Sequence, residues 1–214
     1  MTRKPDQPRD TETEMKILGA ARTVFLRRGT AGARMQEIAE EAGVNQALLH
    51  YYFRTKERLA ATVFREAAGR LLPAVLGVFK SDAPLPDKIE QFVHIYIDAV
   101  RNSPFIPAYV VSEMQHHPER LAAMLEGEGI DPAPIATNLR NKLAAELHEA
   151  ALRGEIRPIA PEQLLLNIIG LAAIPFLARP ALRVVFRMDD PAFHKLLDDR
   201  RAILPGMILN SLRP

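Results

Sequence analysis

The stretch from Met35 to Arg54 limits what this chain can fold into more than any other part of the sequence. Its pattern is typical of two short helices that meet at a sharp turn. Such a pair needs a small residue where the helices cross and a residue that tolerates positive φ at the turn. Ala39 and Gly43 stand at these positions, and Asn45 follows as the expected cap of the second helix. The stretch therefore predicts a helix-turn-helix.

Apolar residues in the same stretch support that prediction. The inner faces of the two helices need apolar side chains at fixed offsets, which the chain supplies as Ile38, Ala42, Val44, Leu49 and either Tyr52 or Phe53. The alternative is an ordinary helical hairpin with an exposed polar face, which is a common arrangement. The combination of a small residue, a glycine, a cap and apolar offsets favours the helix-turn-helix.

The outward face of the second helix carries side chains suited to contact with double-stranded DNA. With the inner face buried, the residues left outside are Gln46, Ala47, Leu48, His50 and Tyr51. A glutamine can pair with adenine through two hydrogen bonds, and alanine or leucine can contact a thymine methyl group. Histidine and tyrosine can donate to phosphates, which positions a protein on DNA without reading its sequence. The second helix is therefore the predicted recognition helix.

Positive charge gathers in the same part of the chain. Residues 1–60 contain 11 Lys and Arg against 8 Asp and Glu, whereas the remaining residues contain 17 against 18. Thr55 is expected to cap a further helix that opens at Lys56, and the free N–H groups of a helix start attract anions. We expect Lys56 to bind a DNA phosphate beside the recognition helix. The alternative is a solvated lysine at a helix start.

Apolar periodicity predicts helices through the rest of the chain and no β-strand. Helix one is expected to begin at Thr11 or Thr13 and to end at Gly29, and Pro73 and Pro175 are expected to kink the helices that contain them. The further helices are expected at residues 34–42, 46–53, 56–80, 87–102, 107–114, 118–127, 133–153, 161–178 and 191–212. The predicted fold class is all-α.

Composition removes several classes of function. The 214 residues include no cysteine, which excludes disulfides, cysteine-bound zinc and thiol redox sensing. The chain has no His-Glu-x-x-His, Gly-rich phosphate loop or Gly-x-Ser-x-Gly, so no enzyme is predicted. Residues 1–10 are polar with two prolines and are expected to be a disordered arm rather than a secretory signal. The longest apolar stretch, residues 164–178, is shorter than the roughly 20 residues that span a bilayer, so we expect a cytoplasmic protein without membrane contact.

A set of short motifs between residues 13 and 59 matches a known family. The motifs are Lys16-Ile-Leu-x-Ala-Ala-Arg-x-x-Phe25, Arg28-Gly29, Ile38-Ala39, Ala42-Gly43-Val44, Leu49-His-Tyr-Tyr-Phe53 and Lys56-Glu57-x-Leu59. Together they resemble the N-terminal domain of the TetR (tetracycline-repressor) family of bacterial transcriptional regulators. The resemblance covers about a fifth of the chain, and the total length suits the same family.

The resemblance implies a homodimeric repressor that binds a palindromic operator in double-stranded DNA and is released by a small-molecule effector. It implies a DNA-binding domain at residues 11–58 and a larger helical ligand-binding and dimerisation domain at residues 59–214. The expected DNA contacts are Thr30, Arg34, Asn45, Gln46, Ala47, His50, Tyr51 and Lys56.

The chain departs from the family pattern at Ala33 and Arg34, where Thr followed by Ser, Thr or Val usually caps the next helix. The change removes a capping hydroxyl and places a cation near a helix start, where the helix dipole disfavours it. Either Arg34 reaches a DNA phosphate or this helix begins less firmly. We favour the phosphate contact.

The C-terminal helices predict a dimer. Helix 133–153 carries an apolar stripe, and helix 161–178 is apolar on every side, which is typical of a helix buried on every side. In a small domain one face then packs on the domain's own core and the other on a partner, and the resemblance implies pairing of the last long helices. The alternative is a wholly internal helix. The predicted interface residues are Leu139, Leu143, Leu147, Ile169 and Ala173.

The effector pocket is the least constrained prediction. A mostly apolar cavity with a few polar groups is typical of such sites, and the candidate lining residues are His94, Tyr96, Phe105, Tyr109 and Met114. They indicate a largely apolar effector. His94 and Asp98 are spaced i,i+4, but without cysteine or a third clustered ligand no metal or cofactor is predicted. The remaining alternatives are a helix-turn-helix protein without an effector and a helical enzyme.

Overall fold

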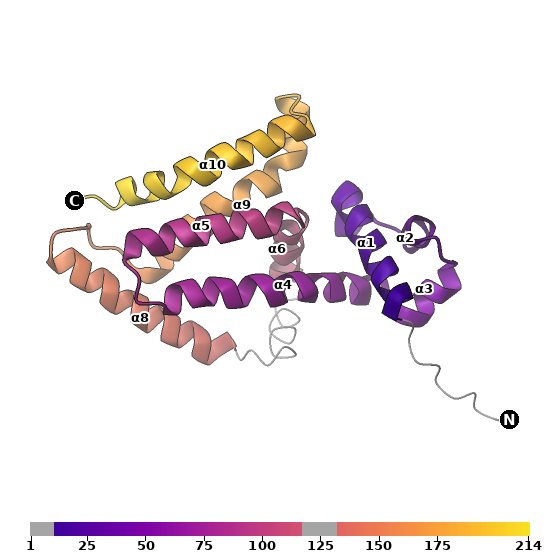
Figure 1. The fold of residues 1–214 in the computed structure, drawn as a ribbon, viewed down its shortest axis with the longest axis horizontal. Helices are drawn as coiled ribbons and strands as arrows, with labels where there is room; N and C mark the ends of the chain where they lie inside the picture. Colours follow the sequence, from indigo (N-terminus) through magenta and orange to yellow (C-terminus); the bar gives the residue numbers. More distant parts are fainter. Residues whose placement is uncertain (1–10, 117–131) are drawn as a thin grey trace. The chain divides into compact units, whose positions relative to one another are not determined.

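The computed structural model describes residues 11–116 and 132–214, and every regular element in these two ranges is a helix (Figure 1). The all-α prediction is confirmed. The helices are α1 (Thr11–Gly32), α2 (Met35–Ala42), α3 (Gln46–Phe53), α4 (Lys56–Lys80), α5 (Leu85–Arg101), α6 (Ile106–His116), α8 (Pro132–Leu152), α9 (Pro161–Val185) and α10 (Asp190–Ser211). The predicted arm at residues 1–10 and the predicted helix at 118–127 lie outside the described residues.

Two helix ends differ from the predictions by three residues or more, while the other described ends agree within two residues. Gly29 has non-helical angles, φ 68° and ψ 168°, but a further helical turn follows it, so α1 ends at Gly32. Helix α9 continues through Pro180 to Val185 instead of ending at residue 178. A proline removes one hydrogen bond from a helix, yet its fixed φ remains close to the helical value. Helix α9 accommodates both Pro175 and Pro180 in this way.

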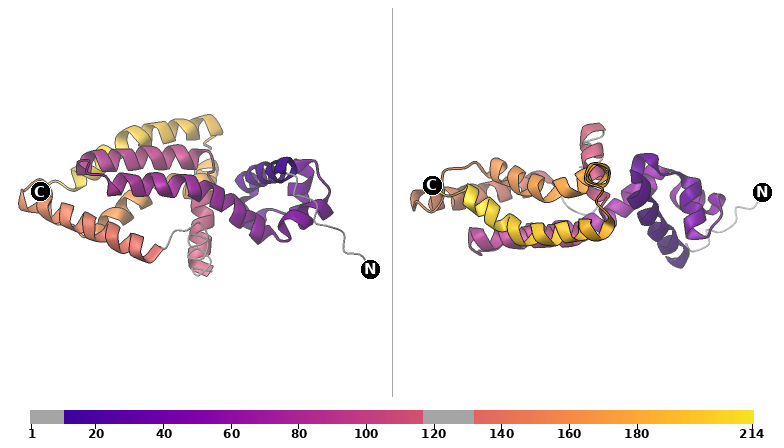
Figure 2. Two further views of the ribbon diagram at one scale, coloured as in Figure 1. Left: turned by 60° about the horizontal axis from the view of Figure 1, so that its bottom comes forward. Right: turned by 90° about the horizontal axis from the view of Figure 1, so that it is seen from above.

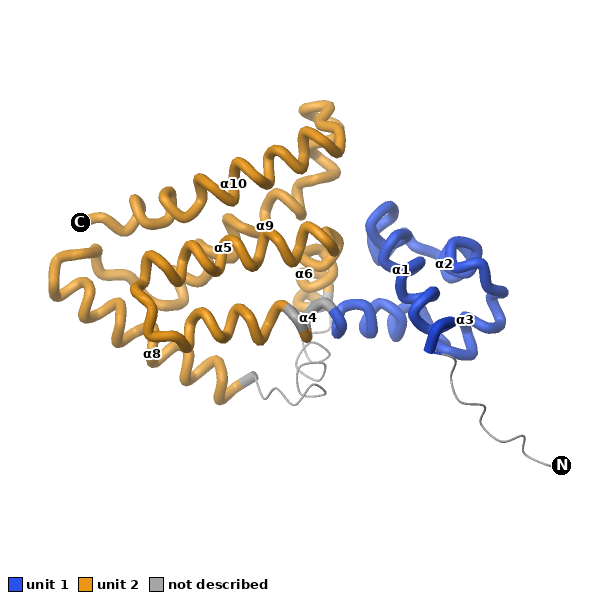
Figure 3. Tube along the Cα trace, in the orientation of Figure 1, with its two compact units in different colours: residues 1–66 blue, residues 67–214 orange. Residues whose placement is uncertain are grey.

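The chain divides into two compact units, residues 1–66 and residues 67–214 (Figure 3). The division falls inside α4, later than the predicted boundary at residue 58, because the first turns of α4 pack on the N-terminal unit. Val63 and Phe64 are buried there, and the Arg22 guanidinium bonds the Glu66 carboxylate.

The N-terminal unit holds α1, α2, α3 and the start of α4 around a small apolar core. One face of α1 packs against α2 and fills the centre of the unit. The fully buried side chains are contributed by all four helical segments and include Ile17, Val24, Phe25, Ile38, Leu49 and Leu59. Exposed ion pairs between Arg27 and Glu41 and between Arg28 and Glu37 join the outer sides of α1 and α2.

The C-terminal unit is a helical bundle in which α10 packs along α5 and α9 (Figure 2). Its core takes aromatic and aliphatic side chains from α4, α5, α8, α9 and α10. Phe79, Phe92 and Tyr96 form a row of ring contacts through this core, with centroids 5.6 and 5.7 Å apart.

Two lysines tie α8 to the other helices of the bundle. Lys88 on α5 is 1% exposed, and its ammonium lies 2.7 Å from both carboxylate oxygens of Glu146 on α8. Lys142 on α8 donates to the carbonyls of Lys80 and Ser81, which end α4, and to the Asp82 carboxylate. The hydrogen bond and the charge of Lys142 hold the pKa of Asp82 below its ordinary value.

Because Lys88 is buried, loss of its partner Glu146 should destabilise the protein far more than loss of an exposed carboxylate on the same helix. Glu146→Ala leaves the buried Lys88 ammonium without its partner, so we expect the free energy of unfolding to fall by about 3 kcal/mol. Glu149→Ala, on an exposed side of the same helix, should change it by less than about 0.5 kcal/mol. Urea unfolding measures both. Equal losses in the two variants would contradict the assignment of Lys88 as a buried, paired charge.

Candidate DNA-binding surface

The turn between α2 and α3 has the geometry that the sequence predicts. Gly43 ends α2 with φ 65° and ψ 30°. These angles lie in the left-handed region, which residues other than glycine adopt only at a steric cost. Its N–H donates to the Glu40 carbonyl at 3.1 Å, and the Val44 N–H donates to the Ala39 carbonyl at 3.0 Å. These bonds satisfy the last carbonyls of α2 and turn the chain directly into α3.

Asn45 caps α3. Its side-chain oxygen accepts the Leu48 N–H at 2.7 Å, so the prediction of Asn45 as a helix cap is confirmed. The same oxygen is then engaged within the protein, which leaves the side-chain amide N–H groups as the part of Asn45 able to contact DNA.

Helix α3 separates into an inner and an outer face as predicted. Leu49 and Phe53 are buried, and Leu48 and Tyr52 are half-buried. The exposed side chains of α3 that were predicted to contact DNA are Gln46, Ala47, His50 and Tyr51. In helix-turn-helix proteins the second helix of the motif lies in the major groove, with exposed side chains at the base edges.

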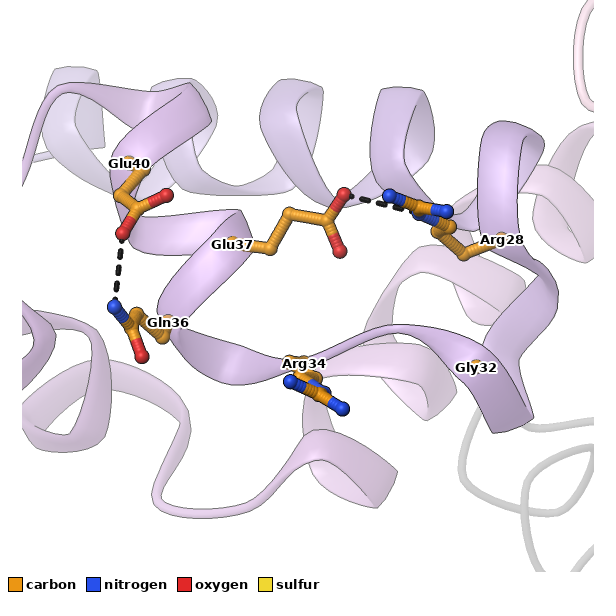
Figure 4. A pocket seen from close by; sticks show the side chains of 6 residues that line it. All are labelled: Arg28, Gly32, Arg34, Gln36, Glu37 and Glu40. Atoms are coloured by element: carbon orange, nitrogen blue, oxygen red, sulfur yellow. Dashed lines mark hydrogen bonds and ion pairs between the residues drawn. The ribbon is translucent and has the colours of Figure 1, made fainter.

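Arg34 begins α2 without capping it. The residue is extended at φ −116° and ψ 142°, and its side chain makes no cap bond. It lies at a surface hollow of about 530 Å³, lined by Arg28, Gly32, Arg34, Gln36, Glu37 and Glu40. In this hollow Glu37 bonds Arg28 and Glu40 bonds Gln36, whereas the Arg34 guanidinium makes no bond to the other five residues (Figure 4). Its donors remain available to an anion.

Lys56 has a structural role that its sequence position did not reveal. Its ammonium donates to the carbonyls of Ala31 at 3.0 Å and Ala33 at 3.2 Å, so it joins the start of α4 to the segment that precedes Arg34. Two of its three donors are thereby used inside the protein, and one remains for a phosphate. Thr30, also predicted to contact DNA, is half-buried in the turn that follows Gly29.

The comparisons with known proteins agree with this geometry. Residues 17–63 match the model of the bacterial regulatory proteins of the tetR family. The HTH-type transcriptional regulator RutR of Escherichia coli (strain K12) is 31% identical over 153 residues, which cover 71% of this chain and 68% of RutR. The chain belongs to the TetR family.

Two further comparisons concern a repressor and a ligand complex. The transcriptional repressor SCO4008 of Streptomyces coelicolor is 32% identical over 122 residues, covering 52% of this chain and 59% of SCO4008. The regulator FadR of Bacillus subtilis, solved in complex with stearoyl-CoA, has a TM-score of 0.60 at 17% identity, over 94% of this chain and 100% of that one. FadR therefore shares the fold of this TetR-family chain.

The predicted effector residues lie in different surroundings. Phe105 and Tyr109 are buried near the start of α6, and His94 is half-buried on α5. Burial raises the pKa of the Tyr96 hydroxyl to about 12. Met114, by contrast, is mostly exposed. Two hollows are described in this unit, and other residues line both of them. The hollow of about 480 Å³ is lined by residues of α5, α8 and α10 and of the adjoining loops, and the hollow of about 270 Å³ by residues of α8, of the loop that follows it and of α9.

The predicted dimer residues on α8 need correction. Leu143 and Leu147 are 1% and 2% exposed, and Leu139 packs against the same core, so they fill the interior of their own chain. On α9, Ala173 is buried and Ile169 is exposed. A core-facing stripe and an interface stripe have the same spacing, so the sequence of α8 does not distinguish a core face from a dimer interface.

Exposed apolar side chains lie instead on α9 and α10. Leu166, Ile203 and Met207 are 68%, 57% and 50% exposed. The two helices are in contact, and the Arg200 guanidinium donates to the Leu171 carbonyl between them. The sequence indicates this apolar face of α10, because Leu196, Ile203 and Met207 recur at helical spacing along it.

Lys56 and Arg34 should differ in their effect on folding. Lys56→Met removes two hydrogen bonds that join α4 to the end of α1, so we expect the free energy of unfolding to fall by about 1–2 kcal/mol. Arg34→Met removes no described bond and should change it by less than about 0.5 kcal/mol. Urea unfolding of the DNA-free protein measures both, and equal stability of Lys56→Met and the unmodified chain would contradict the structural role of Lys56.

Proposed function

We propose that this protein is a ligand-responsive repressor that binds a palindromic DNA operator as a homodimer. The observation that carries the proposal is the exposed outer face of α3, held by a rigid turn and carrying side chains that can read base edges. The repressor assignment is supported by SCO4008, a relative named as a transcriptional repressor. Its place of action is then the bacterial cytoplasm, where the DNA lies.

The proposed DNA contacts divide into two kinds. Gln46 and Ala47 would touch base edges, while His50, Tyr51, Arg34 and the remaining donor of Lys56 would bind phosphates. The exposed or half-buried placement of these side chains is compatible with that division. Thr30 and Asn45 are proposed as further phosphate contacts at the ends of their helices.

Variants at these positions test DNA binding directly. Gln46→Ala should reduce the preference for one base by about 1–3 kcal/mol. Arg34→Met should weaken binding to all sequences alike and lower the salt dependence by about one unit, because one phosphate contact is lost. Fluorescence anisotropy with operator and unrelated DNA measures both. If the unmodified protein showed no preference between the two DNAs at any salt concentration, the proposed function would be wrong.

The proposed dimer is formed by α9 and α10. On α9 the inner residues Leu164, Ile168 and Phe176 belong to the core of the chain, which leaves Leu166 and Ile169 on the outside. Together with Ile203 and Met207 of α10 they provide an apolar surface of the kind that marks an interaction site. A second copy would cover this surface with the same residues, as two-fold symmetry requires.

This surface also bears on membrane contact. Helix α9 is long and apolar enough to cross a bilayer, although 33% of its apolar window is buried in the protein. Its inner face is already packed in the core, so a spanning helix would have to leave that core. We therefore propose a protein partner, not lipid, for the outer face.

A charge on the outer surface should split the proposed dimer. Ile203→Glu should give a folded monomer at micromolar concentration and a large loss of operator affinity, because one half-site alone binds weakly. Leu152→Glu, at an exposed position on α8, is the matched control and should remain dimeric. Light scattering measures the mass, and circular dichroism confirms the fold. A dimeric, folded Ile203→Glu protein would place the interface elsewhere.

The proposed effector is a small, largely apolar molecule held in the C-terminal unit. Support comes from the aromatic residues of α5 and α6 and from FadR, which shares the fold and binds stearoyl-CoA. An effector that releases operator with a coupling of about 1–3 kcal/mol would weaken DNA binding about 5–150-fold.

Reciprocity provides the test of the effector. Stearoyl-CoA is the first probe, and calorimetry measures its affinity with and without saturating operator. If it is an effector, operator must weaken its binding by the same factor by which it weakens operator binding. Equal affinities in the two titrations would exclude stearoyl-CoA as the effector. Failure of a panel of apolar metabolites would favour the alternative of a DNA-binding protein without an effector.

A further inference from the structure

Gln46 and His50 lie one turn apart on the exposed face of α3, and their side chains are in contact. The amide nitrogen of Gln46 lies 3.5 Å from Nε2 of His50. On the other side of the ring, Nδ1 of His50 lies 2.8 Å from the carbonyl oxygen of Arg54. The imidazole therefore stands between the proposed base-reading amide and the end of its own helix.

The Arg54 carbonyl determines which nitrogen of His50 carries a proton. A carbonyl oxygen can only accept, so Nδ1 is the nitrogen that holds its hydrogen in both charge states. The carbonyl is fixed by the end of the helix, where Arg54 adopts φ 60° and its N–H donates to the His50 carbonyl at 2.9 Å. Nε2, which faces Gln46, is therefore the nitrogen that gains or loses the proton.

The charge of the ring then determines which end of the Gln46 amide faces it. Neutral His50 offers a lone pair at Nε2, which accepts one N–H of Gln46. The amide is left with one donor and its oxygen, the pattern that pairs with adenine. Charged His50 offers a donor at Nε2, so the amide must turn its oxygen toward the ring. Two N–H donors then face outward, the pattern that suits the two acceptors of guanine.

We propose that His50 is a positioning residue that selects the orientation of the Gln46 amide, so that one base of each half-site is read as adenine when His50 is neutral and as guanine when it is charged. This inference rests on the proposed function, since it requires α3 to read DNA. It replaces the phosphate contact proposed above for His50, because both ring nitrogens are then engaged within the protein. Histidine suits the role because it changes charge between about pH 5 and 8.

Four charged side chains on α2 and at the start of α4 are bonded to other partners. These are Glu37 with Arg28, Glu40 with Gln36, Glu41 with Arg27, and Lys56 with the carbonyls of Ala31 and Ala33. Arg54 adds a further positive charge at the end of α3 itself.

The test is selection of binding sites from randomised DNA by the full-length protein at about pH 8 and about pH 5.5. We expect one symmetric position of the selected site to prefer adenine about 10-fold over guanine at the higher pH, and the preference to reverse at the lower pH. The other positions should keep their preferences. Selection of the same base at both pH values would overturn the proposal.

Two variants separate positioning from a general structural effect. His50→Lys offers only donors, so it should select guanine at both pH values. His50→Leu leaves the amide free to rotate and should accept both purines at both pH values. His148→Leu, at an exposed position on α8, is the control and should behave like the unmodified protein. Unchanged base selection by both His50 variants would overturn the proposal.

A measurement without DNA distinguishes failure of this inference from failure of the proposed function. Nitrogen NMR of the His50 ring in the free protein at about pH 8 should show the hydrogen on Nδ1 and none on Nε2. The opposite tautomer would overturn the inference even if the protein binds its operator. The expected tautomer without any sequence-specific DNA binding would instead overturn the proposed function, and this inference with it.

Discussion

The N-terminal unit depends on one backbone angle, the positive φ of 65° at Gly43. That angle lets α2 stop within a single residue and lets Asn45 begin α3 two residues later. The short connection fixes where Leu49 of α3 meets the core. Because a helix is rigid, it also fixes the direction in which the outer face of α3 points. The exposure of Gln46 and His50 is thus a consequence of a turn in which neither residue takes part.

The sequence predicted this unit well because its determinants are local. Gly43 and Asn45 act within four residues of themselves, through backbone angles and a cap whose chemistry is independent of the rest of the protein. The split of α3 into faces follows from helical periodicity alone. What local reasoning could not supply was the partner of Lys56, since the carbonyls of Ala31 and Ala33 are more than twenty residues away along the chain.

The C-terminal unit was predicted less well, for a different physical reason. A helix that is apolar on every side does not reveal which side faces the core, and an apolar stripe such as that of α8 has the same spacing in a core as in an interface. Leu143 and Leu147 were therefore assigned to the wrong surroundings. The end of α9 also differs from the prediction, because the fixed φ of Pro180 is close to the helical value and the helix continues through it. Only packing, which the sequence does not contain, resolves such choices.

The exposed apolar side chains of α9 and α10 have a consequence for how a cell would sense the amount of this protein. In the proposed dimer only a second copy covers this surface, so the dimer, which is the form proposed to occupy a two-fold DNA site, would be scarce when the chain is dilute. Below the dimer dissociation constant, the number of dimers rises with the square of the number of chains. Below that concentration, halving the amount of the chain would lower the number of proposed dimers about fourfold, so the response to a change in synthesis would be steeper than the change itself.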